Sequence, residues 1–463
     1  MSLLPTDIDF DALDQAHAAA KDYLSKIDHR RVFPSRADLA GLSGFDEPLP
    51  EQSSSAANIV ETLHRLGSPA STAQMGRRYF GFVNGGALPA ALAAGQLAGV
   101  WDQNAALHKM SPVAAKLEAV CERWIVDLFG LPETTALGLV TGTSMSLACG
   151  FVAARNQLLQ RQGWDVISQG LFAAPAIRVI VGDAAHGTVW KALSLIGLGR
   201  DRVEKIPCDA QGRICPEELP TLDDTCLLIL GAGNVNTGAF DDFSQIMPMA
   251  QAAKAWVHVD GAFGLWAGAS ETYRHLTAGS EQANSWSCDA HKTLNTPYDC
   301  GLILCREREW LVASMQASGS YIQWADDGAR DGMLYTPDMS RRSRGVELWA
   351  ALKSLGRHGV DALVTQLCER AKQFASGLQQ AGYDILNTVD FNQVAVALDT
   401  DQETLAALSY IQESGECWVS GASLQNRNII RVSVCSHRTT PEDVERSIQA
   451  FADAKKKAQR VLR

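Results

Sequence analysis

The sequence has no surplus of basic residues. Its 463 residues include 41 Lys and Arg against 52 Asp and Glu, which gives a formal net charge of −11. A nucleic-acid-binding protein of this size usually shows a basic surplus or a dense basic run. The densest basic stretches here, residues 341–344 and 455–457, are short. We therefore expect no nucleic-acid partner.

Long apolar runs and paired cysteine motifs are also missing. No segment has the roughly 18–20 consecutive apolar residues of a membrane span, and the acidic N-terminus does not resemble a secretory signal. The 11 cysteines are scattered and form no C-x-x-C pair. This pattern predicts free thiols in a reducing cytoplasm rather than a disulfide framework or a metal site. We expect a cytoplasmic protein without a membrane partner.

Apolar runs alternate with helical segments in the middle of the chain. The runs cover residues 137–140, 179–181, 226–230, 256–259 and 301–304. Short, wholly apolar strands between helices predict an α/β domain whose mostly parallel sheet is covered on both faces. Before it, residues 1–70 predict a helical arm and a connector. The sequence thus predicts an arm (1–70), a large domain (71–340) and a smaller α+β domain (341–463).

The smaller domain is predicted from a change of pattern near residue 340. Two long amphipathic helices (346–355 and 360–381) precede two strand-like runs (393–398 and 429–434). A closing helix begins at Thr440, where Pro and acidic residues follow a hydroxyl cap.

The first apolar run leads into a hydroxyl-rich turn. Gly142 permits a tight turn, and Thr143 and Ser144 open the next helix. Their hydroxyls, beside the free N–H groups of a helix N-terminus, could bind a phosphate. A plain helix N-cap is the simpler explanation of these residues taken alone.

Further polar residues follow the later runs, at the strand ends where α/β proteins bind ligands. His186 could stack on a flat ring or move a proton, although an isolated histidine is more often a surface or core residue. Asp260 ends an apolar run, where a carboxylate needs a partner such as a cationic ring nitrogen. Lys292, before a Pro-containing loop, is a candidate for Schiff-base chemistry. Together these residues supply what pyridoxal phosphate needs.

On these motifs the chain resembles the fold-type I pyridoxal-phosphate enzymes. More narrowly, it is similar to the group II amino-acid decarboxylases, which act on aromatic amino acids, glutamate and tyrosine. The resemblance spans about residues 60–450 and is most specific at 258–264 and 289–292. It implies an aspartate-aminotransferase-like large domain, a small C-terminal domain and a helical arm. It also implies a homodimer in which the partner subunit completes the site.

The resemblance also implies roles for individual residues. Lys292 matches the Schiff-base lysine, Asp260 the carboxylate on the pyridine nitrogen, and His186 the histidine stacked on the cofactor near the substrate carboxylate. Other implied cofactor contacts are Thr143, Ser144, Asn236, Ala262, Asp289 and His291. Implied substrate-pocket residues are Tyr79, Phe82 and Gly85. Tyr79 and Phe82 are equally well explained as core aromatics.

The chain departs from the family in the loop before Arg341 and Arg342. The better-known decarboxylases carry a tyrosine there that protonates the substrate carbon. In this chain Gly332 occupies that position, with Tyr335 three residues later and Tyr321 further back. Loss of the tyrosine can divert the reaction toward oxygen and an aldehyde product.

The sequence predicts a decarboxylase that converts an L-amino acid to its amine and carbon dioxide through Lys292. An aldehyde synthase, an aminotransferase and an aldolase use the same cofactor and stay open. An aminotransferase would hold the substrate carboxylate with an arginine such as Arg431, which a structural ion pair explains equally well. A non-catalytic binding protein on this fold is a further alternative. Because Arg77 and Arg78 are the few basic residues near the pocket segments, the sequence weakly disfavours a strongly acidic substrate.

Overall fold

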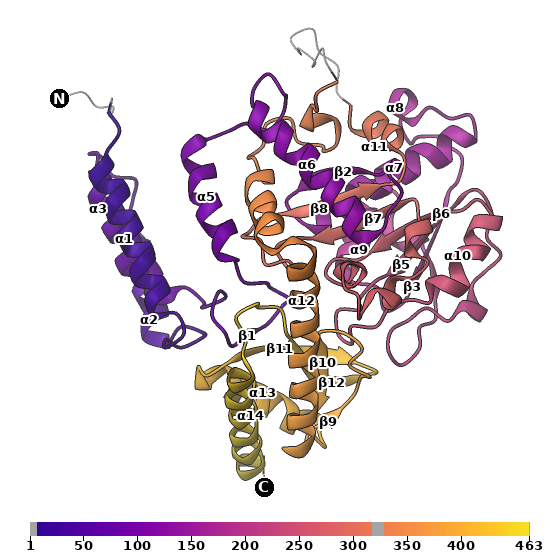
Figure 1. Ribbon diagram of the computed structural model, residues 1–463. Coiled ribbons are helices and arrows are strands. Elements are labelled where there is room, and N and C mark those ends of the chain that lie inside the picture. The colour runs from indigo at the N-terminus through magenta and orange to yellow at the C-terminus, as the bar shows by residue number, and fades with distance from the viewer. Residues whose placement is uncertain (1–6, 317–327, 463) are drawn as a thin grey trace.

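A seven-stranded sheet forms the centre of the molecule (Figure 1). The computed structural model describes residues 7–316 and 328–462. The strand order is β2-β8-β7-β6-β5-β3-β4, and β3 to β7 run parallel while β8 is antiparallel to its neighbours β2 and β7. The strands are β2 (Ala136–Val140), β3 (Arg178–Gly182), β4 (Glu204–Ile206), β5 (Cys226–Gly231), β6 (Trp256–Asp260), β7 (Ser285–Asp289) and β8 (Gly301–Cys305).

Helices cover both faces of this sheet, as the apolar strands require. β2 is buried along its whole length, and β5 along all but its last residue, so neither face can be left to water. One face carries α7 (Thr143–Arg161), α9 (Gly187–Leu195) and α11 (Arg308–Met315). The other carries α6 (Pro112–Phe129), α10 (Phe243–Ala252) and α12 (Gly345–Gln380). The predicted α/β fold of type I is confirmed.

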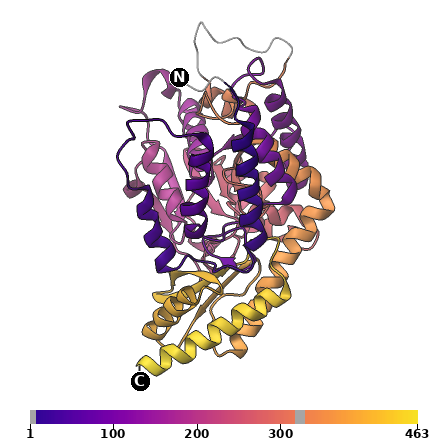
Figure 2. The same cartoon turned by 90° about the vertical axis from the view of Figure 1, so that its left-hand side faces the viewer.

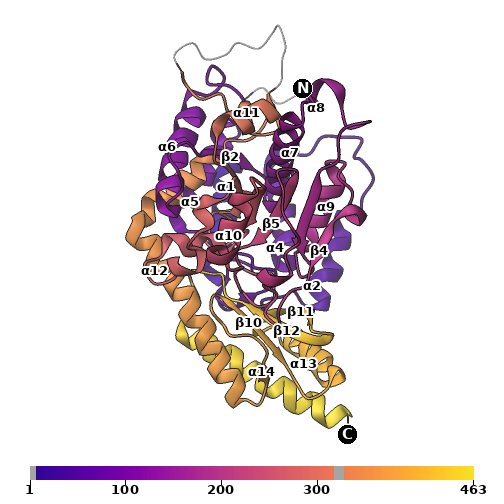
Figure 3. The same cartoon turned by 90° about the vertical axis from the view of Figure 1, so that its right-hand side faces the viewer.

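A second, five-stranded sheet lies below the first (Figure 3). It contains β1 (Tyr79–Phe80), β9 (Asp384–Ile385), β10 (Gln393–Ala397), β11 (Trp418–Leu424) and β12 (Arg427–Ser433), packed with α13 (Asp401–Ser414) and α14 (Pro441–Leu462). β1 comes early in the chain, yet it pairs in parallel with β11, so that Tyr79 lies opposite Trp418. The small sheet is therefore built from residues 79–80 and from residues 384–433, which are far apart in the sequence.

One long element connects the two sheets. The predicted helices 346–355 and 360–381 meet in α12 at Gly356, whose φ of 61° and ψ of −177° break the helix for one residue. Such a positive φ favours glycine. α12 contributes residues to the apolar cores beside both sheets, so it belongs to neither sheet alone. The predicted division into three parts therefore stays a prediction.

The N-terminal helices stand apart from the body of the molecule in Figure 1 and lie in front of it in Figure 2. They are α1 (Phe10–Lys26), α2 (Arg36–Ala40), α3 (Ala56–Thr62) and α4 (Ser68–Ala70), and the nearest body helix is α5 (Pro89–Trp101). Large apolar side chains on this side stay exposed: Ile8, Phe10, Leu13, Ile59, Leu63, Leu97, Val100 and Trp101. Within residues 7–316 and 328–462, no helix is long and apolar enough to cross a membrane.

Short helical turns fill the connections. They are η1 (Gly41–Phe45), η2 (Leu63–Gly67), α8 (Val166–Gln169), η3 (Arg200–Arg202), η4 (Pro216–Glu218), η5 (Gly264–Ala269), η6 (Arg274–Thr277), η7 (Ser280–Gln282) and η8 (Gly332–Leu334).

Candidate active site

A cavity of about 450 Å³ lies at the carboxyl ends of β3, β5, β6 and β7. Its lining includes the residues that follow these strands, because the parallel strands end at one edge of the sheet. Of the predicted site residues, the lining contains Phe82, Thr143, Ser144, His186, Asp260, Ala262, Asp289, His291 and Lys292. Eight of these nine end or follow strands of the large sheet, whereas Phe82 follows β1 of the small sheet, and the structure brings all nine to one cavity.

Lys292 lies beside the buried carboxylate of Asp289. Its Nζ is 3.1 Å from Asp289 Oδ2, and His291 Nε2 is 3.5 Å from the same oxygen. Thr143 donates its hydroxyl proton to Oδ2 over 2.5 Å. Asp289 Oδ1, by contrast, is buried without a hydrogen-bond partner. One carboxylate oxygen therefore organises three of the predicted site residues.

The start of α7 leaves backbone donors free beside this carboxylate. The N–H groups of the first helical turn have no acceptor within the helix. Gly142 precedes that turn, and a Cβ at its position would lie 3.2 Å from His291 Cε1, tighter than normal packing. Glycine at position 142 therefore avoids a close contact with His291. The free N–H groups of Thr143 and Ser144 suit the binding of an anion.

Asp260, at the end of β6, has only one hydrogen bond to the described residues. The Ala262 N–H donates to its Oδ1 over 3.3 Å. Burial raises the pKa of Asp260 to about 6, although the positive charge of Lys292 opposes this shift. A carboxylate in this state is stabilised by a cation placed against it.

His186 caps the N-terminus of α9. Its Nδ1 lies 2.8 Å from the Thr188 hydroxyl oxygen and 3.3 Å from the Thr188 backbone nitrogen. Desolvation lowers the pKa of His186, and the positive charges of Lys292 and Arg431 lower it further. The imidazole is therefore neutral at pH 7, which suits stacking on a flat ring.

Arg431, on β12, reaches the same cavity from the small sheet. The side chain is only 8% exposed, and burial lowers its pKa. Its guanidinium donates to Asn236 Oδ1 over 3.3 Å, while its Nε is buried without a partner. No carboxylate in the described part of the chain forms an ion pair with it, so the structural ion pair considered for Arg431 is not found there.

Three predicted residues lie outside the cavity lining. Tyr79 is buried, and its ring stacks on Trp418 with a centroid distance of 5.4 Å. Asn236 donates to the carbonyl oxygen of Ser423 on β11 and accepts from Arg431, so it joins the two sheets. Gly85 packs on the backbone of Lys292, where any Cβ would overlap its carbonyl oxygen.

Tyr298 is a cavity residue that the sequence reasoning missed. Its ring stacks on His291 with a centroid distance of 4.3 Å, and its hydroxyl donates to Asn84 Oδ1 over 2.9 Å. Burial raises the pKa of the Tyr298 hydroxyl. The available signal was its position in the same loop, six residues after Lys292.

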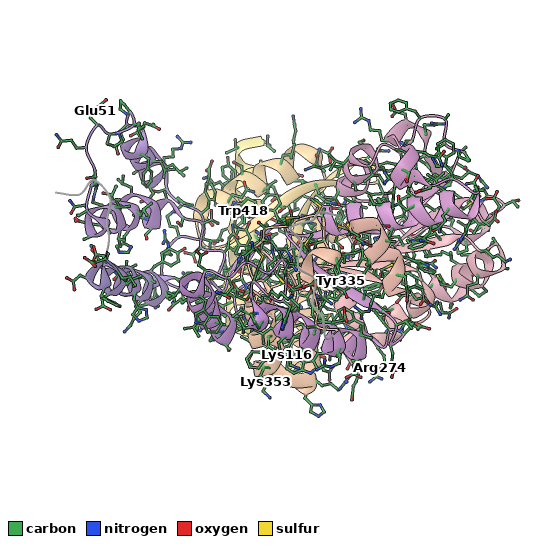
Figure 4. All side chains as sticks on the ribbon, turned by 90° about the horizontal axis from the view of Figure 1, so that it is seen from above. Glu51, Lys116, Arg274, Tyr335, Lys353 and Trp418 are labelled. Carbon is green, nitrogen blue, oxygen red and sulfur yellow. The ribbon has the colours of Figure 1, made fainter. Side chains whose placement is uncertain are left out.

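The loop positions considered for a proton donor lie elsewhere. Tyr335 is buried and absent from the cavity lining; its hydroxyl accepts from Arg308 over 2.7 Å, and the Arg330 guanidinium lies 3.7 Å from its ring centroid. Figure 4 shows Tyr335 and Trp418 on separate parts of the molecule. A side chain at Gly332 would overlap the Arg341 guanidinium. Tyr321 lies outside the described residues.

Comparisons with known proteins agree on one family. A family model described as "Pyridoxal-dependent decarboxylase conserved domain" matches residues 40–398. The chain is similar to an aromatic-L-amino-acid decarboxylase of Drosophila lebanonensis, with 28% identity over 76% of this chain and 92% of that protein. It is also similar to an L-2,4-diaminobutyrate decarboxylase of Rhizobium meliloti (strain 1021), with 26% identity over 90% of this chain and 85% of that protein.

A solved structure shares the fold. The crystal structure of Oryza sativa TDC with PLP and tryptamine superposes with a TM-score of 0.89, covering 98% of this chain and 99% of that chain at 21% identity.

Proposed function

We propose, because this chain belongs to the pyridoxal-dependent decarboxylase family, that it removes the α-carboxylate of an L-amino acid as carbon dioxide and releases the amine. Membership makes the chain an enzyme of the carboxy-lyase type with pyridoxal phosphate as its cofactor. The amino acid and the roles of individual residues are our proposals.

The cavity fits the three reactive ends of pyridoxal phosphate. The open first turn of α7, with Gly142 before it, suits the phosphate. Asp260, a partly buried carboxylate with a single weak hydrogen bond, suits the protonated ring nitrogen. Lys292 supplies the amine that bonds to the aldehyde.

When bound, the cofactor supplies an aldehyde that captures amines and a ring that withdraws electrons from the bond to be broken. The chain's own residues then set the conditions. Asp260 would hold a proton at the ring nitrogen, and the neutral His186 and the small Ala262 would contact the ring.

The observation that carries the proposal is the contact of Lys292 with the buried carboxylate of Asp289, in a cavity whose lining also contains Asp260 and Arg431. Lys292 contacts Asp289, and its charge influences Asp260. Arg431 is buried in the lining without a carboxylate partner in the described chain. We infer that Arg431 and His186 receive the substrate carboxylate, since a buried cation gains most from an incoming anion.

The substrate side chain stays open. Phe82, Val83 and Tyr298 line the cavity beside the polar groups. Two of these are aromatic and one is aliphatic, whereas the Tyr298 hydroxyl adds a polar contact. Arg431 is a cation of the cavity, but we assign it to the α-carboxylate, so it does not by itself favour an acidic substrate side chain.

Aldehyde formation is the second candidate function, and a specific observation favours it. Tyr335, the loop tyrosine nearest the family's proton-donor position, is buried against Arg308 and Arg330 outside the cavity. Without a positioned acid, the substrate carbon would stay unprotonated for longer and be exposed to oxygen. The aminotransferase, aldolase and binding-protein alternatives have no observation of this kind.

A product assay tests both functions. Purified, cofactor-loaded protein is incubated in air with pooled L-amino acids, and carbon dioxide, amines, aldehydes and keto acids are followed by mass spectrometry. Carbon dioxide with the matching amine supports the decarboxylase, whereas carbon dioxide with an aldehyde supports the second candidate. Absence of carbon dioxide, with or without keto acid, would overturn both.

We further propose a homodimer formed through the N-terminal arm and α5. Apolar side chains on these elements are far more exposed than a stable surface favours, with Phe10 at 69% and Val100 at 71%. α1 to α3 stand apart from the body of the molecule, so a second copy could cover them (Figure 1). Light scattering of the full chain should give twice the 49.9 kDa chain mass; a monomer at micromolar concentration would exclude this assembly.

We also propose a cytoplasmic location, because the cysteines are unpaired. All eleven cysteines are free, and nine of them are buried. Burial also raises the pKa of several thiols, Cys149 and Cys417 among them, to about 12, so they stay protonated and unreactive. Thiol titration of the unfolded protein, purified without reductant, should find all of them reduced.

A further inference from the structure

Asn295 is a fully buried residue three positions after Lys292, and its amide contacts two other segments of the chain. We propose that Asn295 is a positioning residue, which fixes the loop that carries Lys292 against the strand that carries Arg431. The inference rests on the proposed function, because it takes Lys292 to bond to the cofactor and Arg431 to receive the substrate carboxylate. It goes beyond that function because it assigns the residue that holds these two groups at one spacing.

The hydrogen-bonding positions of the Asn295 amide are all used. Its Nδ2 donates to the carbonyl oxygens of Thr293 and Cys435, each over 2.8 Å. Its Oδ1 accepts from the backbone N–H groups of Gly86 and His437, each over 2.9 Å. An asparagine side chain has two such donors and one oxygen with two acceptor sites. Because the residue is 0% exposed, loss of the amide would leave these buried backbone groups without partners.

The contacts of Asn295 join three segments that are far apart in the sequence. Gly86 follows β1, which belongs to the small sheet. The contacts at residues 435–437 follow β12, the strand that carries Arg431. Asn295 itself follows β7 of the large sheet, in the same loop as Lys292. One side chain therefore ties this loop to two parts of the chain that extend from the small sheet.

The backbone of Asn295 supports the same arrangement. Its φ of 56° lies in the left-handed region, which asparagine adopts more readily than most residues other than glycine. Its N–H donates to the carbonyl oxygen of Lys292 over 3.0 Å, and its own carbonyl oxygen accepts from the Leu88 N–H over 2.8 Å. The Gly85 N–H donates to the carbonyl oxygen of His291 over 3.2 Å. The loop beside Lys292 is therefore held by backbone bonds as well as by the amide.

The spacing of Lys292 and Arg431 matters for the proposed reaction. Both line one cavity, whereas Asn295 does not, so Asn295 acts through them. The substrate amine is to be received at Lys292 and its carboxylate at Arg431. The bond to the carboxylate breaks only in the correct orientation, and a displacement of about 1 Å can cost about 100-fold in rate. A loosened loop should therefore slow the chemical step more than it weakens substrate binding.

Asn295→Gly tests the role of the amide, because glycine adopts the positive φ without strain and keeps the backbone hydrogen bonds. The cofactor-loaded variant is assayed with the amino acid that the product assay identifies. We expect the visible absorbance of bound cofactor to persist, kcat to fall by about 10- to 100-fold, and KM to change by less than about threefold. An unchanged kcat, or a loss confined to KM, would overturn the inference.

Asn392→Gly is the matched control. Asn392 is equally buried, and its Nδ2 donates to the carbonyl oxygen of Val434 over 2.9 Å. This bond joins the residue before β10 to the residue after β12, so it stays within the small sheet and its flanks. The control should lose stability in urea titrations, as Asn295→Gly should, but keep kcat and KM near the wild-type values. Equal losses of kcat in the two variants would leave Asn295 a purely structural role and overturn the inference.

Amide hydrogen exchange of the unloaded full chain gives a readout that does not depend on activity. In Asn295→Gly the N–H groups of Gly85 and Leu88 keep their acceptors, His291 and residue 295. We expect both groups to exchange about tenfold faster, because their segment is no longer tied to residues 435–437. Unchanged exchange at both would overturn the inference while leaving the proposed function intact. A loaded wild-type chain that releases no carbon dioxide would overturn the proposed function, and the inference with it.

Discussion

The molecule buries two clusters of charged side chains, and they differ in how completely their charges are paired. The first, which we call the α6 cluster, consists of Glu118 and Glu122 of α6 with Arg308, Arg330 and Arg341. The second surrounds Lys292 in the cavity and contains Asp260, Asp289, His186 and Arg431.

In the α6 cluster every carboxylate oxygen has a partner. Arg341 binds both oxygens of Glu118 at 2.7 and 3.0 Å, and Glu122 accepts from Arg308, Arg330 and the Leu137 N–H. Burial alone would raise the pKa of Glu118, but the two facing arginines more than offset it and lower the pKa instead. These charges are fixed in one arrangement.

In the cavity cluster the pairing is left incomplete. Asp289 Oδ1 and Arg431 Nε are buried without partners, and burial raises the pKa of Asp260 to about 6. Unpaired buried charge costs folding free energy. Arg341 Nε of the α6 cluster is also buried without a partner, so the difference lies in the carboxylates. Those of the α6 cluster are fully paired and stabilise the structure, whereas those of the cavity keep an oxygen free for a ligand.

Lys292→Ala gives the largest expected effect, since it removes the one group that bonds to the cofactor. The visible absorbance of bound cofactor should disappear, and carbon dioxide release should fall by more than about 10³-fold. Lys372→Ala is the control: Lys372 contacts Tyr273 and belongs to neither cluster. A Lys292→Ala protein that keeps near-normal product formation would contradict the assigned role.

Glu118→Gln breaks the paired cluster. It leaves Arg341 and Arg330 with one counter-charge fewer in a buried site, and we expect the free energy of unfolding to fall by about 3–5 kcal/mol in urea titrations. Glu416→Gln breaks an exposed pair with Arg446 and should cost less than about 1 kcal/mol. Similar losses in the two variants would remove the distinction between buried and exposed pairs.

Asp241→Asn compares a carboxylate whose pKa is raised with Glu118, whose pKa is lowered, through the pH dependence of the free energy of unfolding. Burial raises the pKa of Asp241 to about 6, so its protonated form stabilises the fold below pH 4 and this contribution is lost as pH rises through 6. The stability of the wild type relative to the variant should therefore fall by about 2–3 kcal/mol between pH 4 and pH 7. Glu118, whose pKa is lowered, predicts the opposite direction. A pH-independent difference between wild type and Asp241→Asn would refute the assignment.

Tyr335→Phe has the smallest expected effect. It tests whether Tyr335, which contacts Arg308 and Arg330 of the α6 cluster, also takes part in the reaction. Loss of the hydroxyl removes the bond from Arg308 and should cost about 1–2 kcal/mol of stability. The ratio of amine to aldehyde product should stay unchanged, because Tyr335 lies outside the cavity lining. A shift of that ratio toward aldehyde would show that Tyr335 reaches the substrate.

Much of the cavity could be predicted because its residues follow strands. His186 and Asp260 are predicted from their places after apolar runs, and Lys292 from its place before a Pro-containing loop and the next apolar run; the structure brings all three to one cavity. Parallel strands end at a common edge, so a position just after a strand already fixes an approximate place in space. β7 was not predicted, because its polar sequence, Ser-Trp-Ser-Cys-Asp, lacks the apolar run that marked the others.

Residues whose place depends on distant packing escaped prediction. For Arg431 the sequence left a carboxylate-binding role and a structural ion pair open, and it did not point to Tyr298, yet both line the cavity. Asn236 and Tyr79, in contrast, lie outside the lining because they pack against β11 of the small sheet. In each case the deciding neighbour is more than a hundred residues away or lies across a loop whose path local sequence does not specify.

By itself, the sequence determined the α/β class, the family and the cofactor, since short apolar strands and the residues after them are local properties of the chain. Only the tertiary structure decided which charges are paired. Glu118 is buried and Asp260 partly buried, and no local pattern shows which of these two acids is paired. The arginines that satisfy Glu118 come from more than two hundred residues away, and no arginine of the described chain pairs with Asp260. Electrostatic pairing acts between groups that meet in space, so the fold alone determines which carboxylate is structural and which is left for a ligand.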